Sequence, residues 1–443
     1  PKLLGRTFAL CKFRILTQLL MNPLNRREFL KGSTALMSLA SFGLLGMDFK
    51  HRKGPLQVAL IGTGWYGKSD LFRLIQVADV EVVGLCDVDS KQLAEAGQLV
   101  STRQKSGKIP VLYENYKELL ANEKPEYVLV GTPDHWHALI AIEALKNGAH
   151  VYLQKPISVD VIEGEAILAA ARKYDRKVQI GTQRRSTPHL MQAKKEIIDS
   201  GKLGKISHAE VCCYYHMRNN SNPDEMPVPD NLNYELWTGP APMLPYRGIL
   251  HRGWRAFMEY GNGIVGDMCV HMLDSVRWML DLGWPIQVTS TGGIYVQKDS
   301  VANISDTQTA FFEFDEMNVV WQHRTWGNPV DKNYPWAFKI YGENGMLAGS
   351  PMRADFYPEG RNNGEPIHYP VVLEKEKYPE DVTEKDNEVH AAPATREQMR
   401  DWLQAIENDT LPVADVLEGH ISTASCILAN ISMELGGRPL RYN

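Results

Sequence analysis

The chain has 443 residues, a formal net charge of −5 and no basic tract, a balance that argues against nucleic-acid binding. Its six cysteines contain no Cys-x-x-Cys pair, so neither a zinc knuckle nor a disulfide scaffold is indicated. Ten tryptophans and 18 tyrosines suit the recognition of sugars, and the length predicts two domains after an N-terminal segment.

The first 50 residues resemble a twin-arginine export signal. The run Asn25–Lys31 carries two adjacent arginines, and the uncharged, mostly apolar stretch Gly32–Met47 follows it. That stretch is shorter than the roughly 20 apolar residues of a membrane span. We therefore expect residues 1–50 to be an upstream extension and an export signal starting at Met21, which directs the folded protein to the periplasm through the twin-arginine machinery. A basic N-terminal anchor is the alternative, and release and retention at the inner membrane both stay open.

A glycine-rich loop with the spacing Gly-x-Gly-x-x-Gly follows an apolar run that is predicted to be a β-strand. Its residues are Gly62, Gly64, Trp65, Tyr66 and Gly67. The first glycine permits a tight turn, the second lets backbone N–H groups approach a pyrophosphate, and the third lets the following helix pack on the sheet. Asp87 directly follows the next strand, Val80–Cys86, where a carboxylate accepts hydrogen bonds from ribose hydroxyls and repels a 2′-phosphate. The loop predicts NAD rather than NADP, and the alternative is a glycine turn that binds nothing.

Strands and helices alternate from Leu56 to Gly181. The predicted strands after the loop are 80–86, 110–113, 126–131, 149–153 and 178–180, and the predicted helices are 116–121, 135–147 and 161–174. This alternation is typical of a parallel, doubly wound α/β sheet. We therefore assign residues 51–181 to a Rossmann domain.

Beyond Gly181 the segments are longer and rich in β-branched and aromatic residues. The predicted strands are 206–215, 286–296, 307–314 and 318–325, and the closing helices are 396–406 and 416–435. The pattern predicts an α+β domain over residues 182–443 with a large, mostly antiparallel sheet. The stretch 350–388, which is crowded with Pro, Gly, Glu and Lys, is predicted to form surface loops.

Two polar clusters fall at places where such folds bind ligands. The first comprises Gly131–His137 and Gln154–Pro156, each at the C-terminal end of a predicted parallel strand. Ligands bind at that edge of doubly wound sheets. The second holds Asp267, His271 and Asp274, whose spacings of four and three place them on one face of a helix.

Taken in order, the glycine loop, Thr-Pro-x-x-x-His, Lys-Pro and Gly-Asp-x-x-x-His resemble the glucose–fructose oxidoreductase / inositol dehydrogenase / rhizopine catabolism (Gfo/Idh/MocA) family. The resemblance runs from about residue 57 to the C-terminus. It implies nicotinamide-dependent oxidation or reduction of sugars, polyols and their derivatives, and an open-faced C-terminal sheet that often mediates oligomerisation. We therefore expect a homo-oligomer, either a dimer or a tetramer.

The resemblance also implies roles for single residues. Lys155 is expected to be catalytic, Pro156 to follow a cis peptide, and Asp267 and His271 to be the family's Asp-x-x-x-His pair. Gln154 stands where the family has a glutamate, so an amide is expected to contact the cofactor. The remainder of the cofactor pocket is implied to be lined by Thr132, Pro133, His137, Gln154, Lys155 and Pro156.

Hydride transfer from a carbinol carbon requires the hydroxyl proton to leave as the carbonyl forms. Histidine titrates near neutrality, so His271 can take that proton, while Lys155 can stabilise the developing negative charge. Asp267 can orient the imidazole or hold a sugar hydroxyl. Asp274 is interpreted as an ordinary helix-face acid, and a core histidine or a surface lysine are the alternatives for His271 and Lys155.

Six further residues are candidates for contacting substrate, because they follow the last parallel strand or precede the helix of Asp267. They are Arg184, Arg185, His189, Trp254, Arg255 and Tyr260, and packing or a structural ion pair would explain each of them equally well. A metal site built from His135, His137, Asp267 and His271 is disfavoured, because His-x-His at a helix start does not place both rings on one face. No metal is expected.

Export would also affect the form of the chemistry. The twin-arginine route carries folded proteins and the periplasm has no pool of free NAD, so the cofactor would be loaded first and kept tightly bound. It would be reoxidised by a second substrate or by a later step on the same sugar. The leading hypothesis is an oxidoreductase for a sugar, polyol or glycoside. The alternatives are a glycoside-cleaving enzyme that works by oxidation, elimination and re-reduction, and a silent NAD- or sugar-binding protein.

Overall fold

The computed structural model describes residues 54–442 apart from 216, 217, 219 and 361–363. The predicted export signal and upstream extension therefore lie outside the described residues. Within the described part of the chain, no helix combines the length and the apolar character needed to cross a bilayer.

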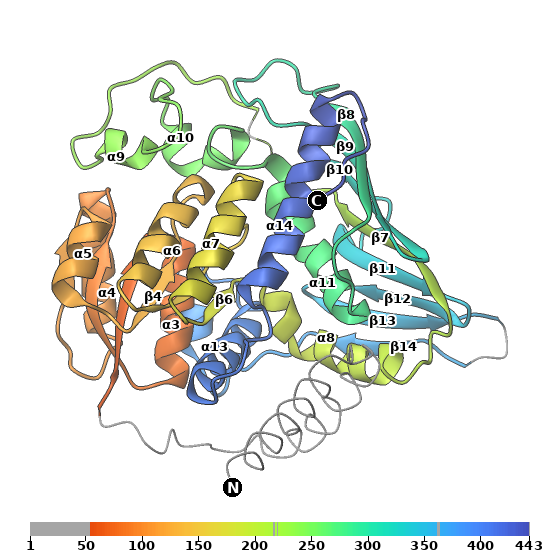
Figure 1. Cartoon of the computed structure of the whole chain (residues 1–443), viewed down its shortest axis with the longest axis horizontal. Helices are drawn as coiled ribbons and strands as arrows, with labels where there is room; N and C mark the ends of the chain where they lie inside the picture. Colours follow the sequence, from red (N-terminus) through yellow and green to blue (C-terminus); the bar gives the residue numbers. More distant parts are fainter. Residues whose placement is uncertain (1–53, 216–217, 219, 361–363, 443) are drawn as a thin grey trace, which may run out of the picture. The chain divides into compact units, whose positions relative to one another are not determined.

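The first sheet has six parallel strands in the order β3-β2-β1-β4-β5-β6 (Figure 1). Its strands are β1 (Leu56–Ile61), β2 (Val80–Cys86), β3 (Val111–Tyr113), β4 (Tyr127–Val130), β5 (His150–Leu153) and β6 (Val178–Ile180). Its helices are α3 (Trp65–Val77), α4 (Ser90–Ser101), α5 (Tyr116–Glu123), α6 (His137–Lys146) and α7 (Val161–Lys173). The strand order reverses between β1 and β4, so the loops after these strands face one crevice, where doubly wound folds bind ligands. The predicted Rossmann architecture is confirmed.

Two hydrophobic cores cover the two faces of this sheet, which explains why its strands read as nearly continuous apolar runs. On one face, α3 and α4 are joined by α13 (Ala392–Glu407) from near the C-terminus. The α13 residue Trp402 is fully buried and packs edge-on against Tyr127 of β4, with 5.6 Å between ring centroids. Residues close to the C-terminus therefore complete the Rossmann layer.

The second sheet has eight strands in the order β14-β13-β12-β11-β7-β10-β9-β8. They are β7 (Ile206–Cys213), β8 (Gln287–Gly293), β9 (Thr307–Phe314), β10 (Met317–Arg324), β11 (Trp336–Gly342), β12 (Gly345–Gly349), β13 (Arg353–Pro358) and β14 (Ile367–Pro370). The pair β7 and β10 is parallel, whereas the other paired neighbours are antiparallel. This confirms the prediction of a mostly antiparallel sheet.

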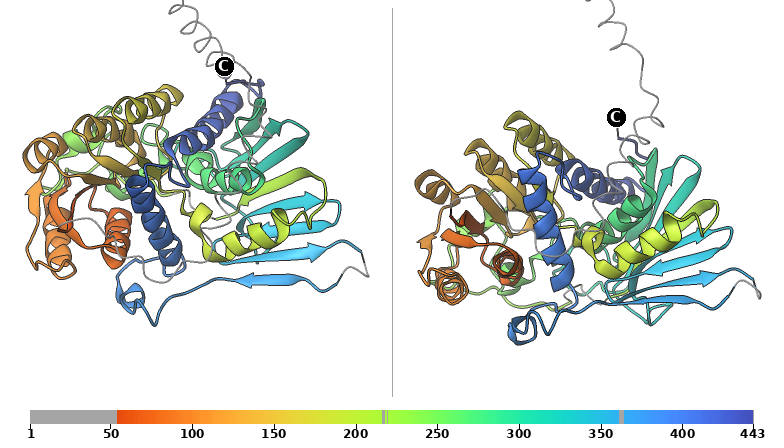
Figure 2. Two further views of the ribbon diagram at one scale, coloured as in Figure 1. Left: turned by 60° about the horizontal axis from the view of Figure 1, so that its bottom comes forward. Right: turned by 90° about the horizontal axis from the view of Figure 1, so that it is seen from below.

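Helices cover one face of the second sheet (Figures 1 and 2). The longer ones are α8 (Pro188–Ala193), α11 (Val270–Leu280) and α14 (Val416–Glu434). Other short segments of the chain are η2 (Asp134–Trp136) after β4, η3 (Gln183–Ser186) after β6, and η4 (Lys194–Ile198), α9 (Tyr234–Thr238), α10 (Ile249–Arg252), η5 (Trp254–Ala256) and η6 (Val265–Cys269) between α8 and α11. Because α14 contacts both α7 and β8, it joins the two sheets into one unit from Pro55 onwards.

The prediction of surface loops for residues 350–388 is wrong in part. The strands β13 and β14 form one edge of the second sheet there, and α12 (Glu380–Thr383) follows. The charged composition suggests exposed loops, but charged side chains of β13 pair with one another and with β14 inside the sheet. Asp355 is buried and pairs with Arg353 at 2.6 Å and with His368 of β14 at 2.6 Å.

Residues 371–391, which we call the return segment, run from the end of β14 back to the Rossmann layer (Figure 2). Arg73 of α3 pairs with Glu384 at 2.5 Å. Arg396 of α13 pairs with Glu374 at 2.8 Å and Asp381 at 2.9 Å. Both arginines are fully buried, so the return segment is firmly anchored to the layer that carries the glycine loop.

Candidate active site

The glycine loop connects β1 to α3. Gly62 has a φ of +90°, which L side chains rarely adopt, and a Cβ there would lie 2.6 Å from backbone atoms of Gly131. A Cβ on Gly67 would collide with the carbonyl oxygen of Gly62, whereas Gly64 faces open space. Gly62 and Gly67 therefore allow close backbone packing, and Gly64 leaves room for a ligand.

No side chain caps the first turn of α3. By contrast, the N-cap residues of α4, α5 and α7 are Asp89, Asn115 and Asp160, whose side chains accept backbone hydrogen bonds. The free N–H groups and the positive end of α3 are therefore available to an anion such as a pyrophosphate.

Asp87 reaches the glycine loop from the end of β2. Its Oδ2 accepts hydrogen bonds from Thr63 N at 2.7 Å, Thr63 Oγ1 at 3.0 Å and Gln92 Nε2 at 3.0 Å. These contacts hold the carboxylate where the adenosine ribose lies in doubly wound folds. A 2′-phosphate at this place would meet its negative charge.

Buried polar atoms without a partner gather after β4 and β6. They include Thr132 Oγ1, Thr182 Oγ1, Gln183 Oε1 and two guanidinium nitrogens of Arg184. Leaving such a group unpaired costs about 1–3 kcal/mol, so native proteins keep few of them without a reason. Together with the uncapped α3 and the glycine cradle, these atoms fit a bound dinucleotide and its substrate.

Lys155 follows β5 and its side chain reaches η6. Its Nζ donates to Asp267 Oδ1 at 2.6 Å and to the Asp267 carbonyl oxygen at 3.1 Å. Arg255 Nε lies 2.9 Å from the same Oδ1. Burial alone would raise the pKa of Asp267, but the charges of Arg255 and Lys155 hold it well below its usual range. The ionised carboxylate therefore fixes both cations.

His271 lies one turn after Asp267 and packs edge-on against Trp336 of β11, with 5.3 Å between ring centroids. Its Nδ1 is buried without a partner. Burial, reinforced by the charges of Lys155 and Arg184, lowers the pKa of His271 well below its ordinary value, so the imidazole is neutral near pH 7. Among the described residues, the Asp267 side chain bonds to Lys155 and Arg255 rather than to this imidazole. The geometry therefore does not support an orienting role for Asp267.

Asp134 is a buried carboxyl to which the sequence analysis gave no role. Its Oδ1 has no hydrogen-bond partner and lies 3.9 Å from Arg255. Burial raises the pKa of Asp134 to about 7, although the charges of Arg255 and Lys155 oppose the rise. Its place in the Thr-Pro-Asp run at a strand end was the signal that could have identified it.

Two models of one oxidoreductase family match the chain. The model of the family's NAD-binding Rossmann fold matches residues 56–182, and the model of its C-terminal alpha/beta domain matches residues 191–317. The chain belongs to the Gfo/Idh/MocA oxidoreductase family. Its NAD-binding fold and its identity as an oxidoreductase follow from that membership.

Relatives in the family carry different names. Inositol 2-dehydrogenase of Salmonella typhimurium is 30% identical over 152 residues, which cover 34% of this chain and 43% of that protein. A glycosyl hydrolase family 109 protein of Shewanella pealeana is 26% identical over 220 residues, which cover 44% of this chain and 47% of that protein. The crystal structure of aldose-aldose oxidoreductase from Caulobacter crescentus complexed with glycerol has a TM-score of 0.64 at 16% identity, covering 88% of this chain and 100% of that one.

Gln154 replaces the glutamate of the Gfo/Idh/MocA pattern and contacts a second carboxyl. Its Nε2 donates to Asp70 Oδ2 of α3 at 2.6 Å, and both side chains are buried. Burial raises the pKa of Asp70 to about 7, although the hydrogen bond from Gln154 and the charge of Arg73 oppose the rise. A carboxyl is thus present beside position 154, but α3 supplies it. The Lys155–Pro156 peptide bond that follows is cis.

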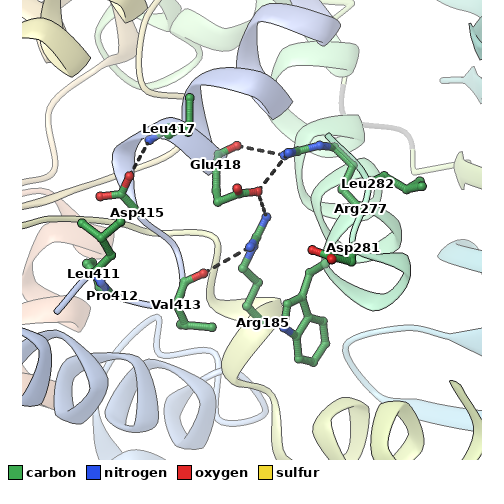
Figure 3. Close-up of a pocket in the computed structure, with 11 residues that line it drawn as sticks. Arg185, Arg277, Asp281, Leu282, Leu411, Pro412, Val413, Asp415, Leu417 and Glu418 are labelled. Carbon is green, nitrogen blue, oxygen red and sulfur yellow. Dashed lines mark hydrogen bonds and ion pairs between the residues drawn. The ribbon is translucent and has the colours of Figure 1, made fainter. Parts of the chain in front are cut away.

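Arg185 takes part in a structural ion-pair network instead of the Lys155 cluster. Its Nε lies 2.8 Å from Asp274 Oδ2, and its Nη2 lies 3.0 Å from Glu418 Oε2. With Arg277 and Glu418 it lines a cavity of about 270 Å³ (Figure 3). The sequence places Asp267, His271 and Asp274 on one helix face, but the two carboxylates have different partners. Asp267 contacts Lys155, whereas Asp274 contacts Arg185. This geometry favours the structural alternative for Arg185.

Three other substrate candidates have partners inside the protein. His189 Nε2 lies 3.0 Å from the Ser350 carbonyl oxygen. Tyr260 is fully buried, with its ring centroid 4.8 Å from that of Trp237. Trp254 packs against Arg255, whose guanidinium carbon lies 4.0 Å from its ring centroid.

The cofactor-loop candidates divide between exposed and buried positions. Trp65 is 49% exposed, whereas Tyr66 is half-buried and its hydroxyl accepts a hydrogen bond from Gln183. His137 connects the loops after β4 and β5, since its ring nitrogens lie 2.9 Å from the Thr132 carbonyl oxygen and 2.7 Å from that of Pro156. Among residues 54–442 as described, no group of three His, Cys, Asp or Glu side chains is arranged to hold a metal ion.

Proposed function

We propose that the protein is an NAD-dependent oxidoreductase that acts on a sugar, polyol or glycoside by hydride transfer. The observation that carries the proposal is the cluster of Lys155, Asp267 and Arg255 beside a neutral His271, at the crevice of a Rossmann fold. Relatives named inositol 2-dehydrogenase and aldose-aldose oxidoreductase support this substrate class.

The side chains of the cluster have distinct tasks in this proposal. A lysine ammonium has three N–H donors, and Asp267 accepts two of those of Lys155, which leaves one for a substrate oxygen. That donor stabilises the negative charge that develops as the hydroxyl proton leaves. The neutral imidazole of His271 accepts the proton. NAD, held by the glycine loop and Asp87, supplies the hydride acceptor when bound.

We also propose that the protein is exported and keeps its NAD tightly bound, with a second sugar or a later step on the same sugar as the reoxidant. The twin-arginine pattern at Asn25–Lys31 supports export, and the anchored return segment is consistent with slow exchange of the cofactor. Cell fractionation of the native chain and of a variant with Arg26 and Arg27 changed to Lys tests export. Light scattering tests the proposed homo-oligomer.

The decisive experiment uses protein purified without added cofactor. Absorbance in the reduced-nicotinamide band is recorded while neutral sugars, polyols, sugar acids and their glycosides are added one at a time. Reduction that persists until a second sugar is supplied supports the two-substrate oxidoreductase. Absence of bound cofactor after simple desalting counts against tight retention.

The glycoside-cleaving reaction is the second candidate, favoured by the relative named as a glycosyl hydrolase family 109 protein. In that reaction, oxidation acidifies the adjacent C–H, the glycosidic oxygen is eliminated, and the keto group is reduced again. Release of a coloured aglycone with no net change in the nicotinamide band identifies it.

A further inference from the structure

Arg184 differs from the other buried arginines. Six arginines are buried in the described part of the chain. Four of them, Arg73, Arg185, Arg277 and Arg396, form ion pairs with carboxylates, and Arg218 donates to backbone carbonyls. Arg184 is 1% exposed, yet its Nε and Nη1 have no acceptor, and no carboxylate among the described residues lies within 4 Å.

An arginine keeps its charge in proteins, so burying this guanidinium without an acceptor is costly. The protein offers only weak compensation nearby. Burial lowers the pKa of Arg184, and the opposing groups are Tyr66, Glu388 and Tyr215. A ligand that brings a negative charge and acceptor oxygens would satisfy the guanidinium.

The position of Arg184 places such a ligand at the reaction centre. Its guanidinium carbon lies 5.4 Å from the ring centroid of Trp336, and the same ring lies against His271. The ring of Tyr215 also lies beside Trp336, with 6.2 Å between the two ring centroids. Aromatic rings beside a proton acceptor suit a sugar ring, and Arg184 then meets a substituent of that ring.

The surroundings favour a singly charged carboxylate over a phosphate. Glu388 of the return segment adds negative charge close to Arg184, which opposes a dianion. His189 and His390 also face Arg184, and burial, together with its charge, lowers the pKa of both, so neither adds positive charge near pH 7. Of these groups, Arg184 alone is therefore positively charged near pH 7.

We infer that Arg184 binds a carboxylate of the substrate, so the substrate is a sugar acid such as a uronic acid or its glycoside. The inference rests on the proposed oxidoreductase function and deepens it, because it names the substrate class of that same site. Glu388 is then a specificity-determining residue that limits the charge the site accepts.

Matched sugars test the inference on the holoenzyme. Glucuronate is compared with glucose and galacturonate with galactose, both free and as methyl glycosides, by the rate of cofactor reduction. The acid is expected to have a KM about 10- to 100-fold lower than its neutral partner, the range for a buried charge-assisted contact. Arg184→Gln should abolish this preference, Arg184→Lys should restore part of it, and Glu388→Gln should strengthen it.

Arg400→Gln, which removes an α13 arginine that is paired with Glu397, is the matched control and should keep the preference. Equal KM values for acid and neutral sugars would overturn the inference while leaving the oxidoreductase proposal intact. Loss of bound NAD from Arg184→Gln with an unchanged preference would also overturn it, because Arg184 would then be a cofactor contact. If no sugar reduces the cofactor, the proposed function fails, and calorimetric binding of glucuronate to the holoenzyme and to Arg184→Gln still decides the role of Arg184.

Discussion

Replacing Asp70 by asparagine should change how the stability of the protein depends on pH. Asp70 is buried against Gln154, and burial raises its pKa from 3.8 to about 7. Between these values the folded protein binds a proton that the unfolded chain has lost, so stability falls as pH rises through this window. A change of one unit in pKa corresponds to about 1.4 kcal/mol of folding free energy. Ionisation of Asp70 in the folded protein therefore lowers the free energy of unfolding by about 4 kcal/mol above pH 7, and about 3 kcal/mol of this loss develops between pH 5 and pH 8.

The asparagine of the Asp70→Asn variant keeps an oxygen for the Gln154 amide but has no proton to lose. Urea unfolding at pH 5 and pH 8, with the same excess of NAD, should therefore show a smaller loss of stability for Asp70→Asn than for the native protein. Asp315→Asn, at an exposed turn between β9 and β10, controls for the removal of one charge. Equal losses in the native protein and in Asp70→Asn would refute the reasoning.

The same contact predicts the effect of restoring the family's glutamate. Gln154→Glu would place two carboxyls within hydrogen-bond distance in a buried site, where they can be accommodated only by sharing a proton. We expect the loss of stability between pH 5 and pH 8 to be larger in Gln154→Glu than in the native protein, and to be recovered in the double variant that also carries Asp70→Asn. A fully stable Gln154→Glu protein at pH 8 would contradict this.

The Lys155 cluster and the Arg185 network lead to three more expectations. Lys155→Met should lower turnover by about 10²- to 10⁴-fold while the NAD content of the purified protein is retained. Because the pKa of His271 is depressed, the reaction should slow only at acid pH, where the imidazole becomes protonated, and a rate that rises on acidification would contradict its role as proton acceptor. Arg185→Met should destabilise the fold by about 3 kcal/mol in urea unfolding, because the buried Asp274 would lose its two hydrogen bonds from Arg185 and keep only Ser422 and the more distant Arg277, and turnover per folded molecule should persist.

The features that depend on local sequence could be predicted. The spacing of Gly62, Gly64 and Gly67 follows from a single strand–turn–helix unit, and each glycine has the backbone environment that the pattern requires. The position of Lys155 after a parallel strand likewise follows from the alternation of strands and helices.

The features that depend on distant partners could not be predicted. Arg184 and Arg185 are adjacent in the sequence, yet among the described residues Arg185 pairs with the carboxylates of Asp274 and Glu418 and Arg184 pairs with none. Glu388 belongs to the return segment, which Arg73 and Arg396 hold against the Rossmann layer. No pattern around residue 184 or residue 388 encodes these long-range contacts.

The return segment also has a mechanical consequence. It begins at the edge strand of one sheet and is attached to helices that belong to the other, so it acts as a tether across the joint between them. Opening that joint would require the ion pairs of Arg73 and Arg396 to break together, and these buried contacts are shielded from salt. The attachment of the return segment should therefore depend on temperature far more than on ionic strength.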